Sequence, residues 1–130
     1  MECVRLVESL PKTNTAFRLG DQLLRCGTSV GANYRAACRA KSAADFISKM
    51  GTVEEEADEC IYWLELLIEA KHLLPNHAKL LLNEANQIVA MTVASINTAR
   101  TNSRPSKNNP KSAIRNPQSA RPQSTRAGVV

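Results

Sequence analysis

A chain of 130 residues has room for one domain, and only five of its residues are aromatic, so the core must be built from aliphatic side chains. Its longest apolar run is too short to span a bilayer, and the start Met1-Glu2-Cys3-Val4-Arg5 is unlike a signal peptide. We therefore expect no membrane partner and a cytoplasmic location. The net charge of +5 comes from the C-terminal end: residues 1–100 carry 11 basic and 12 acidic residues, whereas residues 101–130 carry six basic and no acidic residues.

Two helical segments are predicted in the first forty residues. The first runs from Glu2 to Ser9 and ends at Leu10-Pro11. The second runs from about Asn14 to Ala40. Its inner face is predicted from apolar or small residues at steps of four and three, which are Leu23, Gly27, Val30, Tyr34 and Ala37.

The third predicted helix, from Ser42 to about Leu74, has the clearest pattern. Its apolar positions recur as in the seam of a bundle helix, at Phe46, Met50, Val53, Ala57, Cys60, Leu64 and Leu67. Ser42 and Asp45 form a capping box at its start, and Pro75 is expected to stop it. The last helix is predicted from about Pro75 to Arg100, with an inner face of Leu81, Ala85, Ile88, Thr92 and Ile96.

These segments predict an all-α fold, an up-down antiparallel four-helix bundle over residues 1–101 with a short first helix. The third helix would be about 50 Å long, whereas the first would cover about 12 Å. Either some bundle surface is left for another subunit, or the true protein begins upstream of Met1.

Residues 102–130 are predicted to be a disordered, basic, low-complexity tail, because they hold few apolar side chains to bury. A short repeat runs through residues 109–115 and 116–122. It fits a basic arm that touches nucleic acid, or read-through of non-coding DNA beyond an older stop codon.

Four basic residues are the candidate nucleic-acid-binding site: Arg25, Arg35, Arg39 and Lys41. Arg35 and Arg39 are four residues apart on one helix face, and guanidinium groups so spaced can straddle a phosphate backbone. The alternative is structural, with these cations pairing with acids of the next helix or of another subunit, namely Glu54, Glu55, Asp58 and Glu59.

No catalytic, cofactor or metal site is predicted. Glu69 and His72 form one Glu-x-x-His half of a di-iron motif, but Leu74 stands three residues before the other histidine, His77. The sequence has no G-x-S-x-G, glycine-rich phosphate loop or CxxC pair. We therefore expect no enzyme activity, and we expect the four cysteines to pack as small hydrophobic residues.

The segments 22–46 and 54–67 together resemble a known family. The pattern is a Gln22-Leu-x-Arg25 start, then Ser29-Val-x-x-Asn33, then the Ser42 cap, an Asp45-Phe46 pair and a Glu-rich helix. It is similar to the 23S rRNA intervening-sequence proteins over roughly residues 4–98. The resemblance departs at Ala36 and Ala37, where many members carry Glu-Gly.

The resemblance implies a left-handed four-helix bundle that assembles into a ring-like homo-oligomer, commonly a pentamer, and that has no established catalytic activity. A related accessory protein of diversity-generating retroelements binds nucleic acid and a reverse transcriptase, which favours RNA or DNA as a partner by analogy. We interpret the chain as a homo-oligomeric scaffold or adaptor whose basic helix face contacts RNA or DNA. The alternative is a protein–protein interaction module with no nucleic-acid role.

Overall fold

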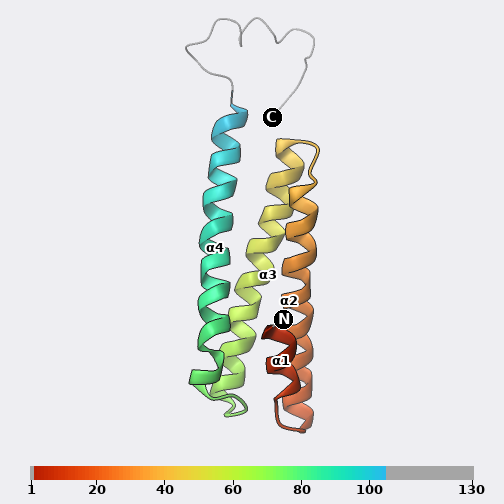
Figure 1. The fold of residues 1–130 in the computed structure, drawn as a ribbon, viewed down its shortest axis with the longest axis vertical. Helices are drawn as coiled ribbons and strands as arrows, with labels where there is room; N and C mark the ends of the chain where they lie inside the picture. The colour runs from red at the N-terminus through yellow and green to blue at the C-terminus, as the bar shows by residue number, and fades with distance from the viewer. Residues whose placement is uncertain (1, 105–130) are drawn as a thin grey trace, which may run out of the picture. The chain divides into compact units, whose positions relative to one another are not determined.

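The computed structural model describes residues 2–104, which form the four helices α1 (Glu2–Glu8), α2 (Asn14–Cys38), α3 (Ala43–Glu69) and α4 (Pro75–Ser103). Residues 1–99 form one compact unit, in which α2, α3 and α4 run side by side in alternating directions (Figure 1). The predicted all-α up-down bundle is confirmed. Of the predicted tail, residues 102–130, Asn102 and Ser103 belong to α4, so the prediction of disorder is wrong for these two residues, and residues from 105 onward lie outside the described residues.

Side-chain caps begin both α2 and α3. The Thr13 hydroxyl accepts a hydrogen bond from the Ala16 backbone N–H at 3.1 Å, and the Ser42 hydroxyl accepts one from Asp45 N–H at 3.0 Å. Each bond satisfies a backbone donor that the first turn of a helix leaves free. The Ser42 cap confirms the start predicted for the third helix.

The third helix ends earlier than predicted, at Glu69 rather than near Leu74. Lys71 adopts a left-handed conformation with φ 62°, and its N–H donates to Ile68 O while His72 N–H donates to Leu67 O, both at 3.0 Å. This pair of bonds is a Schellman motif, which closes a helix end without proline. The turn that follows Glu69 places Leu73 in the core, where its side chain is 6% exposed.

The last helix begins at Pro75 as predicted but continues to Ser103, three residues beyond the predicted end. The Ser103 hydroxyl donates to Arg100 O at 3.1 Å, within the last turn. Pro105 follows in the sequence, and a proline disfavours helical backbone in the residue before it.

The core of the unit consists of two clusters. The larger joins α1 to α2, α3 and the start of α4, and includes Leu6, Leu10, Leu23, Cys26, Leu64, Leu67 and Ala78. The smaller joins α2, α3 and α4 through Ala37, Met50, Val53 and Ile96. Six of the seven seam residues predicted for α3 are buried, and Phe46 is partly buried.

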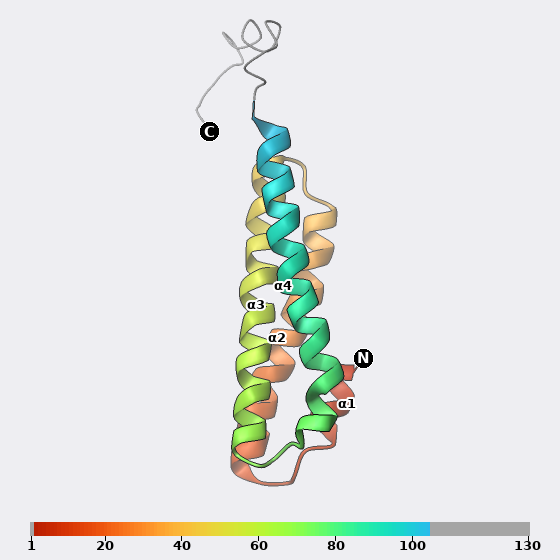
Figure 2. The ribbon, with the colours of Figure 1, turned by 90° about the vertical axis from the view of Figure 1, so that its left-hand side faces the viewer.

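Helix α1 lies beside only the N-terminal part of the much longer α2 (Figures 1 and 2). Its Cys3 lies against Gly27, where an added Cβ would be 2.7 Å from the Cys3 sulfur. Farther along α2, Val30 is partly exposed and Tyr34 is 43% exposed. The prediction that Tyr34 faces the core is therefore wrong. We attribute its exposure to the short length of α1, which reaches only as far as Gly27 and does not cover Tyr34.

Over residues 2–104, no helix combines the length and the apolar character needed to cross a membrane. The cytoplasmic location stays a prediction.

Candidate nucleic-acid interface

Arg25 lies in the middle of α2 and faces α3. Its guanidinium contacts Glu56 at 3.1 Å and Glu59 at 2.8 Å, so it bridges the two helices. The Arg25 side chain is 50% exposed, whereas that of Glu56 is 13% exposed. Because both forks of the guanidinium already bind carboxylates, the structural interpretation describes Arg25 better than phosphate contact does. Sequence reasoning missed Glu56 as a partner, because spacing alone does not show which acid of a run turns toward α2.

The thiol of Cys26 lies beneath this ion pair. Its sulfur is 3.4 Å from Glu59 Oε1 and 3.0 Å from the Arg25 Nη2 atom. Burial, and then the hydrogen bond to Glu59, raise the pKa of Cys26 to about 11. The thiol is therefore neutral at physiological pH and is a poor nucleophile.

The other cysteines also match a packing role more than a chemical one. Burial raises the pKa of Cys60 to about 12 and raises that of Cys3. Cys3, Cys26 and Cys60 are buried free thiols, whereas Cys38 is exposed. The prediction that the cysteines pack as small apolar residues is therefore confirmed for these three and wrong for Cys38.

Arg35, Arg39 and Lys41 lie together at the end of the unit where α2 turns into α3, and we call these three residues the basic end. Arg35 is in the last turn of α2, Arg39 caps the helix, and Lys41 follows in the turn. All three are exposed, and they form no salt bridge with any other residue in the range 2–104. Arg25 precedes Arg35 by ten residues, about 15 Å along the helix, so the structure separates it from the other three candidates.

The part of α3 that follows carries the opposite charge. From Glu54 to Glu69 it has seven acidic residues and no basic one. Glu55, Asp58, Glu65 and Glu69 are exposed, with the 54% exposed Tyr62 among them. The unit thus presents positive charge at the α2–α3 turn and negative charge along the rest of α3.

The half-motif of Glu69 and His72 falls at the end of α3, where His72 is partly buried and His77 is exposed. Among the described residues, no group of three or more His, Cys, Asp or Glu side chains is placed to hold a metal ion. Tyr62 and Trp63 form an edge-on aromatic pair with centroids 5.0 Å apart, and Trp63 packs against the larger core cluster.

The helices and the charge distribution define a class of small all-α bundles with a short first helix and a basic turn. Residues 1–94 match the family of 23S rRNA-intervening sequence proteins, and the chain belongs to that family. A crystal structure of a protein of unknown function from the S23 ribosomal protein family of Bacteroides thetaiotaomicron is similar, with 37% sequence identity and a TM-score of 0.67. The match covers 72% of this chain and 87% of the Bacteroides chain. No curated protein matches the chain.

Proposed function

We propose that this family member is a non-catalytic, homo-oligomeric scaffold or adaptor, and that its basic end contacts RNA or DNA. The observation that carries the assembly proposal is the outer surface of α4. Between Ala85 and Ala99 the helix has no charged residue. An exposed helix face of a monomer normally carries charged side chains, and depletion of charge marks the centre of an interface.

One stripe along this outer surface is small, apolar or amide-bearing. Exposed residues recur at steps of three and four, at Asn83, Asn86, Ala90, Val93 and Asn97, and we call them the α4 face. Val93 is 41% exposed. Three of these five residues are asparagines, and an asparagine at a helix contact can fix register and subunit number at a cost in stability. The family resemblance favours a ring, commonly of five subunits.

Sedimentation velocity tests the assembly. We expect the full chain to sediment as a homo-oligomer and Val93→Glu to shift it to the monomer, because burying an unpaired carboxylate at a helix contact is costly. Ala32→Glu on α2 is the matched control, since Ala32 is also exposed. A monomeric parent chain would contradict the proposal.

The support for nucleic acid is the exposed basic end, whose three cations have no acidic partner in the described part of the chain. Fluorescent structured RNA and duplex DNA should be titrated with the full chain at several salt concentrations. We expect Arg35→Ala/Arg39→Ala to weaken binding and to reduce the slope of log K against log salt by about 0.9 per lost phosphate contact on duplex DNA.

Arg25→Ala is the matched control for that titration, because the Arg25 guanidinium is already bound to Glu56 and Glu59. We expect it to leave the salt slope unchanged. Equal binding by the parent chain and the double variant would overturn the nucleic-acid role. The alternative, a protein–protein interaction module, would then be favoured, with the acidic surface of α3 as its docking face.

A further inference from the structure

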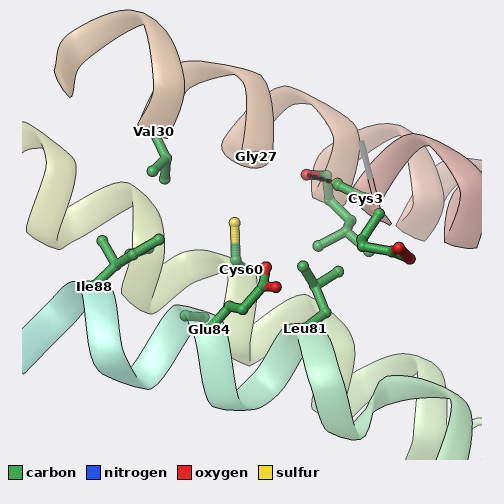
Figure 3. Close-up of a pocket in the computed structure, with 11 residues that line it drawn as sticks. Cys3, Gly27, Val30, Cys60, Leu81, Glu84 and Ile88 are labelled. Atoms are coloured by element: carbon green, nitrogen blue, oxygen red, sulfur yellow. Dashed lines mark hydrogen bonds between the residues drawn. The ribbon is translucent and has the colours of Figure 1, made fainter. Parts of the chain in front are cut away.

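A pocket of about 250 Å³ lies between the four helices, where α1 begins. Side chains from α2, α3 and α4 form its apolar wall: Leu23, Val30, Ala57, Leu81, Ala85 and Ile88. Figure 3 shows Val30 and Ile88 on one side of this space and Leu81 on the other. Gly27 lines the pocket at the point where Cys3, near the start of α1, contacts α2.

Two thiols complete the wall without adding charge. The Cys60 sulfur points into the space between α2 and α4, and Cys3 lies at its edge (Figure 3). The raised pKa of each thiol keeps it protonated at neutral pH. Cys3 also donates a weak hydrogen bond to Leu23 O at 3.6 Å, so its thiol hydrogen is not available to a ligand.

The charged groups of the pocket are both acidic. Glu2 and Glu84 contribute to the lining, which includes no Lys, Arg or His. Glu2 is paired with Arg5 at 3.1 Å. Glu84 is the sole charged residue of α4 between Lys79 and Arg100, and its carboxylate turns toward the pocket (Figure 3). Glu84 is an exposed residue at the solvent side of the pocket, and within residues 2–104 its carboxylate forms no hydrogen bond or salt bridge with another residue.

We propose that this pocket binds a small amphipathic amine, with the ammonium group at the Glu84 carboxylate and the apolar body between Val30, Leu81 and Ile88. Charge complementarity selects the cation, because an unpaired carboxylate at the rim of an apolar space stabilises a positive charge and repels an anion. A neutral molecule would gain from the apolar wall alone.

The size of the pocket limits the ligand to a fragment. An engineered apolar cavity of about 150 Å³ in another protein holds a benzene ring. The larger volume here, about 250 Å³, has room for one ring and a short chain that carries the amine. It is below the range of about 300–1,000 Å³ that is common for drug-sized ligands.

The test compares three probes of similar shape on the full chain: 2-phenylethylamine, 2-phenylethanol and 3-phenylpropanoate. Binding would be followed by two-dimensional amide NMR at millimolar probe. We expect the amine to bind most tightly and the carboxylate least, with shifts at the amides of Gly27, Cys60 and Glu84. Equal affinity for all three probes, or no binding of the amine, would overturn the proposal.

Glu84→Gln is expected to weaken amine binding about fivefold and to leave the alcohol unaffected, since it removes one partly solvated ion pair. Glu65→Gln, which neutralises an exposed carboxylate of α3 outside the lining, is the matched control and should leave both affinities unchanged. Val30→Phe fills the pocket and should abolish binding of both probes. Retention of the amine preference in Glu84→Gln would show that the cation is bound elsewhere.

Discussion

At the scale of single residues, two glycines of α2 differ in what surrounds them. A Cβ at Gly27 would lie 2.7 Å from the Cys3 sulfur, whereas a Cβ at Gly31 would meet nothing within 4 Å. Both are helical, and glycine in a helix lowers stability relative to alanine by about 0.5–1 kcal/mol. Gly27 is therefore needed for the close approach of α1, and Gly31 is not.

We predict that Gly27→Ala lowers the free energy of unfolding by about 1 kcal/mol, since the clash with Cys3 exceeds the gain in helix propensity. Gly31→Ala should raise it by about 0.5–1 kcal/mol. Denaturant titration of both variants measures the difference. A gain in stability from both substitutions would show that α1 does not pack closely on α2.

At the scale of helices, the end of α3 shows where sequence reasoning failed. Proline was a plausible stop signal, but the left-handed Lys71 ends the helix four residues before Pro75, after the C-cap residue Ala70. A lysine carries no sequence signal for this conformation, which favours glycine because a Cβ crowds the backbone there. The turn that follows buries Leu73 in the core, a tertiary contact that local periodicity does not encode.

Lys71→Gly should therefore raise the free energy of unfolding by about 0.5–1 kcal/mol, because glycine removes the strain of the left-handed residue. Lys79→Gly is the matched control, since Lys79 is an exposed residue within α4. It should lower stability by about 1 kcal/mol. Thermal unfolding followed by circular dichroism would measure both, and a loss in both variants would contradict the strain argument.

The contact between α2 and α3 through Arg25 gives a second prediction at this scale. In double-mutant cycles with Arg25→Met, the coupling to Glu56→Gln should exceed that to Glu59→Gln. Glu56 is 13% exposed, whereas Glu59 is 46% exposed and is more strongly screened by water. Denaturant unfolding of the single and double variants measures both couplings. Equal couplings would show that burial of Glu56 does not strengthen its pair.

At the scale of the whole molecule, much of the fold followed from periodicity, because the seam of α3 repeats without interruption from Met50 to Leu67. The candidate site was less predictable. Helical spacing placed Arg35 and Arg39 on one face, but spacing alone did not show that Arg25 turns to Glu56. The pocket beside Gly27 arises because α1 is short and because the Glu84 side chain is directed toward the space that α1 leaves. Both features depend on the packing of all four helices.

The buried thiols make the stability of the unit depend on pH. The pKa of Cys60, ordinarily 9.0, is about 12 in the folded chain, so the folded state keeps a proton that the unfolded state releases above pH 9. The free energy of unfolding should therefore fall as pH rises above 9, and it should fall less steeply in Cys60→Ala. Urea titrations over a pH series measure both slopes, with Cys38→Ala as the exposed control. Identical slopes in all three proteins would contradict this account.

The brevity of α1 has a consequence for exchange with solvent. A helix of seven residues does not persist alone in water, so α1 stays folded only while Cys3, Leu6 and Leu10 remain docked. Local opening should release α1 before the rest of the unit unfolds. Its amide hydrogens should then exchange with deuterium faster than those in the middle of α2 and α3. Each opening would also uncover Leu23, which is fully buried, so the rate at which α1 undocks sets how often water reaches this side chain.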